Sequence, residues 1–388
     1  MDRMTTRAAI SIAAAAVIGI LLVYATEIGL VFSVLVPTLS FLQNRRIHAF
    51  LISFAYYGAA SSIIIPGAKS FFGPGTSWGF PIMVWGVATI LLAVPFGGLW
   101  SKNRHSAVWR APLAVLASVP PPLGIIGWAN PITAAGILFP GSGWSGLLAV
   151  LSFVAFSIRH FRASVYVLII SAILANAVFS GIPAPPSDWE SVNTRFGGFS
   201  LATSKLFNEF EAAEYIQQRA LKSKARFIVF PESVVPSWNE STELFWEPTL
   251  SRLRASGKTV IIGAGIDVPE TARYANVVII RGAENGVFSQ RIPVPIGMWH
   301  PFGSQGVPLA PFGPGAIKLR NQRITLLICY EQFLTWSVLI SSASNPTLLI
   351  GISNEYWAGD TVIPNVQLRL LHVWSRLFGL ATLSAVNR

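Results

Sequence analysis

Three residues with chemically useful side chains come just after short apolar runs in the second half of the chain: Glu232, Cys329 and Asn354. Short runs rich in branched residues predict buried β-strands. Open α/β sheets bind their ligands at the carboxyl ends of such strands. A carboxylate beside a thiol can accept its proton, and the thiolate can then attack an amide or ester carbonyl. The spacing therefore predicts a nucleophilic cysteine site with a glutamate base.

The elements that must position these residues are strands of a covered sheet with helices between some of them. Residues 204–222 have apolar side chains at helical spacing, with acids early and Arg219 and Lys222 late, as the helix dipole favours. The pattern predicts a layered α/β domain. The predicted strands are Phe227–Phe230, Val260–Ile262, Val277–Ile280, Ile324–Ile328 and Leu348–Ile352.

The first half of the chain differs from the second in charge. Before residue 183 there are ten Lys and Arg and two acidic residues, whereas the remainder has 18 Lys and Arg and 15 acidic residues. A membrane domain of about seven transmembrane helices over 1–182, a turn-rich linker over 183–200 and an α/β domain over 201–388 explain this division. The predicted spans are 8–25, 28–43, 48–65, 80–100, 112–128, 144–158 and 163–181.

Nearly all basic residues of the first half fall before the first span or after the second, fourth and sixth spans. The positive-inside rule makes those loops cytoplasmic. With an odd number of spans, the N-terminus is then cytoplasmic and everything after residue 182 is periplasmic. The expected location is the bacterial inner membrane, as a multi-pass protein. A cleaved signal peptide is the alternative for the first span, although the further spans favour a retained anchor.

Motifs around the three candidate residues resemble those of the nitrilase (carbon–nitrogen hydrolase) superfamily. They are Pro-Glu-Ser-x-x-Pro around Glu232, Cys-Tyr-Glu beginning at Cys329, and Ser-Asn-Glu-x-Trp-x-Gly-Asp over 353–360. With Val-Pro-Ile-Gly at 294–297, the chain looks most like apolipoprotein N-acyltransferase. More narrowly, it looks like a family of conjugal transfer proteins of Ti-type plasmids. The resemblance implies an α-β-β-α sandwich attached to a membrane bundle.

The resemblance also implies catalytic roles. That superfamily uses a Glu base, a Lys that stabilises the tetrahedral intermediate and a Cys that becomes acylated, and Glu232 and Cys329 match the first and last. The position of the Lys holds Gln290, followed by Arg291. Gln290 offers a hydrogen bond without charge, and the loss of an oxyanion donor costs about 10²–10³ in rate. Arg291 carries charge, but one step along a strand turns its side chain to the opposite face.

Four further residues are expected to support the site or to bind its substrate: Glu331, Asn354, Trp299 and Trp357. Plainer interpretations stay open for several of the candidates. Cys329 could be a small buried apolar residue, Glu232 could cap a helix, and the two tryptophans, like Phe302 and Phe312, could belong to the core rather than to an acyl pocket.

No cofactor and no metal are expected, because the five histidines are scattered without ligand spacing. The basic residues form no stripe interleaved with aromatics, which disfavours direct nucleic-acid binding. The expected partners are the lipid bilayer and, as the resemblance implies, a lipid or acyl substrate and other conjugal transfer proteins.

Two functions are compatible with these observations. One is an amidase or acyltransferase that works through a thioester on Cys329. The other is a catalytically degenerate nitrilase fold that binds or assembles a transfer apparatus, which the missing lysine favours. A transporter is less favoured, since the predicted spans carry no ionisable residue near their centres.

Overall fold

The computed structural model describes residues 3–197, 205–269, 271–359 and 361–388. Residues 198–204, at the end of the predicted linker and the start of the predicted α/β domain, lie outside the described part, as does Asp360 of the third motif.

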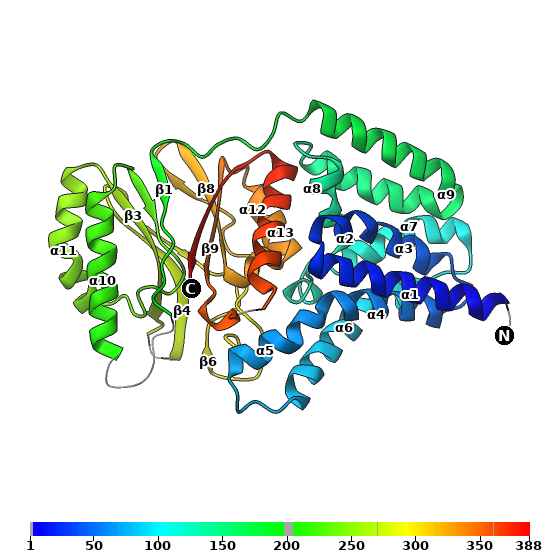
Figure 1. Cartoon of the computed structure of the whole chain (residues 1–388), viewed down its shortest axis with the longest axis horizontal. Coiled ribbons are helices and arrows are strands. Elements are labelled where there is room, and N and C mark those ends of the chain that lie inside the picture. The colour runs from blue at the N-terminus through cyan, green and yellow to red at the C-terminus, as the bar shows by residue number, and fades with distance from the viewer. Residues whose placement is uncertain (1–2, 198–204, 270, 360) are drawn as a thin grey trace. The chain divides into compact units, whose positions relative to one another are not determined.

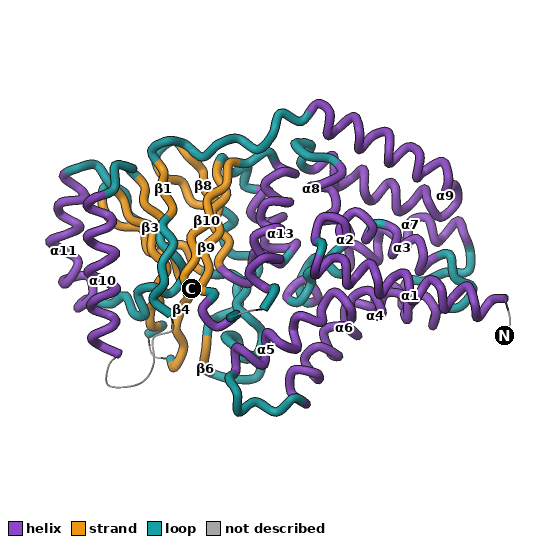
Figure 2. Tube along the Cα trace, viewed as in Figure 1, coloured by secondary structure: helices purple, strands orange, loops and turns teal. Residues whose placement is uncertain are grey.

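Contacts divide the chain into two compact units. The helical unit comprises residues 1–182, 333–336 and 360–379, and the α/β unit comprises residues 183–332, 337–359 and 380–388. The first division falls between Ile182 and Pro183. Strands, orange in Figure 2, all belong to the α/β unit among the described residues.

Apolar helices make up most of the helical unit (Figure 1). Among the described residues, four helical stretches are long and apolar enough to cross a membrane: Thr6–Tyr24, Arg46–Phe72, Gly79–Leu99 and Trp144–Val178. Their large apolar side chains are often exposed, as at Val178 (82%), a surface that suits lipid better than water. The helices before residue 182 are α1 (Arg3–Tyr24), α2 (Thr26–Ser33), α3 (Leu35–Phe41), α4 (Arg46–Ala60), α5 (Ile64–Phe72), α6 (Gly79–Leu99), α7 (Arg104–Ala117), α8 (Ala135–Leu138) and α9 (Trp144–Val178).

The prediction of a span over 112–128 is wrong. Helix α7 begins earlier and ends at Ala117, and turns and short 3₁₀ segments follow it. The run Pro120–Pro122 explains the difference. Proline has no N–H to donate to the helix and disfavours a helical conformation in the residue before it, so the helix ends before the run.

The predicted spans 144–158 and 163–181 form the two arms of α9, which is broken at His160 (φ −127°, ψ 54°). A straight helix of this length would hold its ends about 50 Å apart. Instead, the side-chain amide of Asn176 donates to the carbonyl of Leu138, six residues before the helix begins (3.2 Å). The arms therefore lie side by side, as Figure 1 shows.

Helix α13 (Ile363–Phe378) joins the helical unit although it comes late in the sequence. The amides of Gly141 and Gly143 donate to the carbonyls of Arg376 (2.7 Å) and Leu377 (2.8 Å). A Cβ on Gly136 would come within 2.1 Å of the Val373 carbonyl oxygen, so only glycine permits α13 to approach α8 this closely. The last helix is thus fixed to the apolar part of the chain by backbone contacts.

The α/β unit contains two sheets. The first has the order β1-β2-β3-β4-β5, with β1, β2 and β3 parallel and β4 and β5 antiparallel to their neighbours, and β6 pairs with β4. Its strands are β1 (Trp189–Ser191), β2 (Phe227–Val229), β3 (Thr259–Asp267), β4 (Ala272–Gly282), β5 (Gly286–Ser289) and β6 (Gln305–Gly306).

The second sheet has the order β10-β9-β8-β7, in which β10, β9 and β8 are parallel and β7 is antiparallel to β8. Its strands are β7 (Ile317–Leu319), β8 (Gln322–Ile328), β9 (Leu348–Asn354) and β10 (Ala381–Asn387). All five predicted strands lie within β2, β3, β4, β8 and β9 or extend them by a single residue.

Alternation along each strand builds two cores. Phe227 and Val229 of β2 point into the layer between the sheets, whereas Ile228 and Phe230 point to the other side. That other side is covered by α10 (Lys205–Lys222) and α11 (Glu240–Ala255), which contribute buried residues such as Trp246. Helix α12 (Thr335–Ala343) follows β8. The predicted fold class, an apolar helical part followed by a layered α/β domain, is confirmed.

Candidate active site

The three residues at strand ends come together in the α/β unit. The backbone N–H of Asn354 donates to Glu232 Oε2 at 2.9 Å, and the thiol of Cys329 donates to the carboxyl group of Glu232. Gly263 of β3 makes this possible, because a Cβ there would lie 2.4 Å from the Cα of Glu232. The segment after β2 therefore lies directly on β3.

Glu232 is a buried carboxyl group held by neutral donors. Its side chain is 4% exposed, and the Asn276 side-chain amide donates to Oε1 at 2.7 Å. Burial raises the pKa of Glu232 above its ordinary value, although the hydrogen bonds from Asn276, Cys329 and Asn354 oppose that rise. The charge of Glu331 raises this pKa further. Protonated Glu232 is consequently favoured more than in a solvated glutamate.

Cys329 lies in a backbone conformation that few residues adopt. Its φ is +50°, at the junction between β8 and the short 3₁₀ segment that follows. Burial raises the pKa of the thiol well above its usual range, and so do the charge and hydrogen bond of Glu232. The backbone N–H of Tyr330 opposes this shift. A strained nucleophile at a strand end fits an active site, and its resting form is the protonated thiol.

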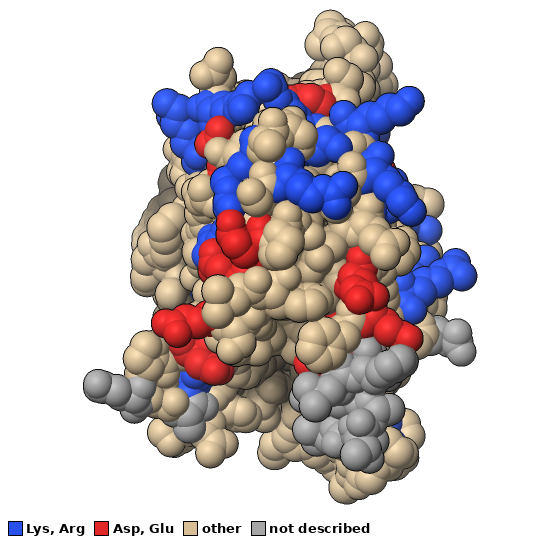
Figure 3. Space-filling view, turned by 90° about the vertical axis from the view of Figure 1, so that its left-hand side faces the viewer, with Lys and Arg blue, Asp and Glu red and all other residues tan. Residues whose placement is uncertain are grey.

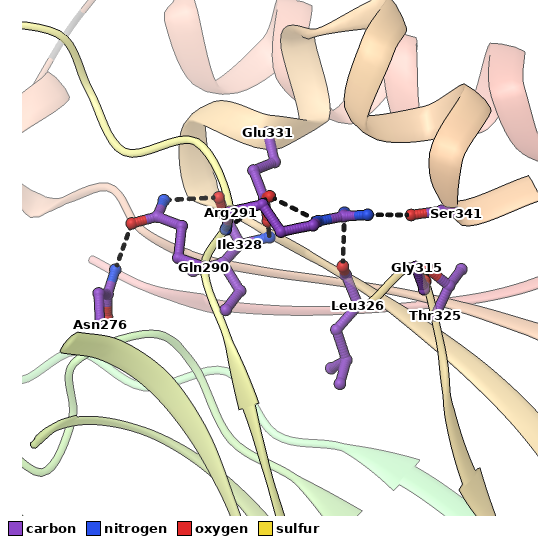
Figure 4. Close-up of polar contacts among 9 residues, drawn as sticks. All are labelled: Asn276, Gln290, Arg291, Gly315, Thr325, Leu326, Ile328, Glu331 and Ser341. Atoms are coloured by element: carbon purple, nitrogen blue, oxygen red, sulfur yellow. Dashed lines mark hydrogen bonds and ion pairs between the residues drawn. The ribbon is translucent and has the colours of Figure 1, made fainter. Parts of the chain in front are cut away.

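Gln290 and Asn276 form a neutral hydrogen-bonded relay next to Glu232 (Figure 4). Asn276 Nδ2 donates to Glu232 and also to Gln290 Oε1 (3.0 Å), and Gln290 Nε2 donates to the Ile328 carbonyl (3.0 Å). Glu232 accepts from Asn276, so the Asn276 nitrogen must face it. The same nitrogen donates to the Gln290 oxygen, so the orientation of both amides is fixed. The relay leads from Glu232 to the residue before Cys329 and contains no charge of its own.

Arg291 is directed away from this relay, as Figure 4 shows. Its Nε donates to Glu331 Oε1 (3.0 Å), one terminal nitrogen donates to Ser341 Oγ (3.0 Å), and the other is 3.5 Å from the Leu326 carbonyl. Glu331 also accepts the backbone N–H groups of Arg291 and Ile328, each at 3.0 Å. The guanidinium is therefore occupied, 2% exposed, in a buried ion pair and does not reach the Glu232 carboxyl.

Asn354 is held in place by Asn387 at the end of β10. Asn387 is fully buried, donates to Asn354 Oδ1 (2.9 Å) and the Gly197 carbonyl (3.0 Å), and accepts from Thr194 Oγ1 (2.8 Å). This network connects β9, β10 and the segment after β1, and it ends at the N–H that binds Glu232.

Glu355 adds a second carboxyl group near the thiol, since its charge also raises the pKa of Cys329. Burial raises its own pKa, which the hydrogen bond from Ser353 and the nearby Arg388 oppose. Both Glu232 and Glu355 thus favour the protonated form of the thiol.

The aromatic candidates lie in loops. Trp299, half-buried, follows β5, and Trp357, also half-buried, lies in the short 3₁₀ segment after β9. Phe302 is 104% exposed and Phe312 71% exposed, so neither belongs to the core. A role for the two tryptophans in binding an acyl chain stays a prediction.

In the described part of the chain, His, Cys, Asp and Glu form no group of three or more that could hold a metal ion. The titratable residues of the site are a thiol and carboxyl groups, which are the groups that nucleophilic acyl chemistry uses.

The chain matches no protein-family model. It is 30% identical to a probable conjugal transfer protein TraB of Sinorhizobium fredii over 344 residues, which cover 87% of this chain and 86% of that protein. The chain belongs to the TraB family of conjugal transfer proteins. Another TraB protein, from Agrobacterium fabrum, is 28% identical over 92% of this chain and 87% of its own length.

More distant similarity extends to the acyltransferases. An apolipoprotein N-acyltransferase of Methylococcus capsulatus is 26% identical over 165 residues, 39% of this chain and 32% of that protein. Among solved structures, a Nesterenkonia amidase of the nitrilase superfamily is similar over 51% of this chain and 75% of its own, with 13% identity and a TM-score of 0.37. A carbon–nitrogen hydrolase from Helicobacter pylori covers 51% and 72%, with 15% identity and the same TM-score.

The resemblance to apolipoprotein N-acyltransferases is confirmed, and the apolar helices together with these relatives identify a membrane protein. Asn276, Asn387, Ser341 and Glu355 were not predicted as site residues. The sequence held a signal for Asn276, an amide inside the apolar run Ala275–Ile280. Such a buried amide needs partners.

Proposed function

We propose that this TraB-family chain acts in plasmid conjugal transfer as a membrane-anchored nitrilase-type acyl-transfer or amide-hydrolysing protein. The role in conjugation rests on the names of its TraB relatives. The chemistry rests on one observation: the thiol of Cys329, at φ +50°, donates to the carboxyl group of Glu232.

The proposed reaction uses Glu232 first as base and then as acid. Ionised Glu232 accepts the thiol proton while sulfur attacks an acyl carbonyl carbon, whose π electrons move to oxygen. As the carbonyl re-forms, the bond to the leaving nitrogen or oxygen breaks, and Glu232 returns the proton to it. A thioester on Cys329 remains. Water or an amine then attacks the thioester and gives a proton to Glu232, and Glu232 returns this proton to the Cys329 thiolate as the acid or the amide leaves.

Two N–H groups are the proposed oxyanion donors. The backbone N–H of Tyr330 already points to the Cys329 sulfur, and Gln290 Nε2 has a second hydrogen besides the one bonded to Ile328. Neither carries a positive charge. We expect a slower reaction than with a lysine at position 290, by about 10²–10³.

Intact-protein mass spectrometry of the full chain purified from its own membranes tests the thioester. The wild type is expected to carry an acyl-sized mass that hydroxylamine removes, and Cys329→Ala is expected to lack it. Glu232→Gln serves as a matched control that keeps the thiol but loses the base. An unmodified wild type whose Cys329 also fails to react with a thiol alkylator in the folded state would rule out this chemistry.

A binding or assembly module is the second candidate, and the neutral Asn276–Gln290 relay favours it. Where the related enzymes have a lysine, this relay supplies hydrogen bonds that hold Glu232 without activating it. In that case Cys329→Ala would support conjugal transfer at the wild-type frequency in a plasmid mating assay. A thioester enzyme would lose transfer in the same assay.

We further propose that the helical unit lies in the bacterial inner membrane with a cytoplasmic N-terminus and a periplasmic α/β unit. Contacts at one end of the helical unit support this orientation. Trp100, next to Lys102, donates to the Gln43 carbonyl near Arg45 (3.2 Å), and Arg159 contacts His105 (3.0 Å). The basic segments gathered there suit the cytoplasmic side.

Reporter fusions test this orientation in living cells. Alkaline phosphatase fused after residue 388 is expected to be active and green fluorescent protein at the same place dark. The reverse pair of results would place the α/β unit in the cytoplasm.

A further inference from the structure

The outward side of α10 and α11 carries large apolar side chains that are exposed in the α/β unit. Phe210 is 54% exposed, Tyr215 47%, Leu244 74% and Phe245 39%. The rings of Phe210 and Phe245 meet edge to face at 5.3 Å and so join the two helices. We call this surface, from Phe210 to Lys222 and from Glu240 to Ala255, the α10–α11 face. Contiguous exposed apolar side chains of this kind mark an interaction surface.

A hollow and a projection occur together on the α10–α11 face. A cavity of about 260 Å³ opens between the first turns of the two helices and the segment after β2, and both apolar residues, such as Phe210 and Phe245, and polar residues, such as Glu209 and Thr242, line it. Leu244, the most exposed of the large apolar residues of the face, precedes Phe245 directly. Both features lie on the half of the face in which the helices begin, so a copy bound antiparallel around a two-fold axis meets them with the other half of its own face.

Charge on the α10–α11 face is divided along the helices. Both helices run opposite to the parallel strands β1, β2 and β3 that they connect, so they start at the same end. Exposed acids lie on their first halves or at the middle (Glu211, Glu214, Glu240) and exposed cations on or near their last halves (Lys222, Lys224, Arg252). Figure 3, which looks onto this side of the α/β unit, shows the cations gathered at one end and acidic patches farther down.

These six charged side chains have no ion pair with another described residue, in contrast to Arg254, which pairs with Glu247 on the same helix. Helix dipoles favour this placement of charge. The same placement has a consequence for association. Two such faces laid antiparallel bring the acids of each against the cations of the other, whereas a parallel arrangement opposes like charges.

We propose that the α10–α11 face binds a second copy of this chain around a two-fold axis, with the helices of the two copies antiparallel. The acidic half of each face, which includes Leu244, meets the basic half of its partner. This association goes beyond the proposed chemistry and does not depend on Cys329.

Charge reversal on the full chain in nanodiscs tests the proposal. The wild type is expected to be dimeric by mass photometry. Lys222→Glu with Arg252→Glu places acids on the basic half of the face, and Glu211→Lys with Glu214→Lys places cations on the acidic half. Each variant alone is expected to be at least tenfold weaker in self-association. An equimolar mixture of the two is expected to regain dimers, because both of its contacts then join opposite charges.

Matched controls keep misfolding apart from loss of contact. Lys318→Glu with Arg323→Glu reverses two exposed cations on β7 and β8, outside the α10–α11 face, and is expected to stay dimeric. Leu244→Asp is expected to be monomeric with an unchanged circular dichroism spectrum. A monomeric wild type, dimers that persist in every variant, or a mixture that fails to reassociate would each overturn the proposal. A different protein or a small apolar ligand bound to the face in the monomer would do the same.

Discussion

Gln290 and Arg291 are neighbours in the chain, but the structure places their side chains in two different polar environments. Gln290 belongs to the relay between Glu232 and the Ile328 carbonyl, which is built from amides and holds a carboxyl group without a cation. Arg291 belongs to a buried ion pair with Glu331, in which the carboxylate also accepts two backbone N–H groups. No cation faces Glu232 in the relay, whereas Arg291 balances the charge of Glu331 in the ion pair.

The two environments give Gln290 and Arg291 different roles in the molecule. The buried ion pair also holds the backbone just after β5 and at the end of β8, and so it fixes the frame of the site. Removal of one partner leaves an isolated charge. Burial raises the pKa values of Glu232 and Cys329, and the neutral relay adds no cation that would lower them. We therefore expect changes at Arg291 or Glu331 to act on stability and changes at Gln290 to act on reactivity.

Breaking the ion pair should have the largest effect. Glu331→Gln leaves the Arg291 guanidinium buried without a counter-charge, and we expect the free energy of unfolding to fall by about 3–5 kcal/mol. Urea unfolding in detergent micelles, followed by tryptophan fluorescence, measures it. The double variant Arg291→Met with Glu331→Gln should recover part of the loss. If Glu331→Gln loses less stability than the double variant does, the pair does not stabilise the fold.

Adding a cation to the neutral relay should have the next largest effect. Gln290→Lys places an ammonium group near Glu232 and Cys329, which lowers both pKa values and supplies a charged oxyanion donor. We expect faster alkylation of Cys329 at neutral pH, by about three- to fourfold for each unit by which its pKa falls, because a thiolate of lower pKa is also a weaker nucleophile. Thioester turnover, where it occurs, should rise about 10²–10³. Gln290→Met, similar in length but uncharged, is the control. Equal alkylation rates in both variants would contradict this role for charge.

Most of the fold could be predicted from the sequence because its signals are local. Runs such as Ile324–Ile328 are buried on both sides and appear as β8, and the division in charge near residue 183 coincides with the boundary between the units. The failures have local causes too. Pro120–Pro122 ends α7 early, and α13 joins the helical unit through backbone contacts to Gly141 and Gly143 that no periodicity reveals.

The site was predictable only where motifs mark it. Glu232 and Cys329 stand in recognisable segments, and the alternation along a strand anticipated that Arg291 turns away from Gln290. The partners were not predictable. Asn276 and Asn387 lie 44 and 155 residues from Glu232 in the sequence, and only the pairing of strands brings their amides to this carboxyl group or its neighbour. Hydrogen bonds across sheets depend on register, which the sequence of one strand does not contain.

The raised pKa of Glu232 predicts a smaller effect, a dependence of stability on pH. A carboxyl group whose pKa is raised in the folded state stabilises the fold below its unfolded pKa, near 4.3, and loses this contribution as pH rises through the folded value. Between the unfolded and the folded pKa values, the free energy of unfolding falls by up to about 1.4 kcal/mol per pH unit. Urea unfolding of wild type and Glu232→Gln between pH 4 and pH 8 measures it. The variant should lose less stability than the wild type as pH rises, and parallel curves would contradict the raised pKa.

Breaking an exposed ion pair should have the smallest effect on the free energy of unfolding. Arg320 Nε and Glu284 Oε1 are 3.0 Å apart, the same separation as in the Arg291–Glu331 pair, but their side chains are 38% and 28% exposed. Water screens such a pair, so Glu284→Gln should change the free energy of unfolding by only about 0–1 kcal/mol. The same urea titration that measures Glu331→Gln compares the two pairs directly. A loss at Glu284 as large as the loss at Glu331 would mean that distance, and not burial, decides what these pairs contribute.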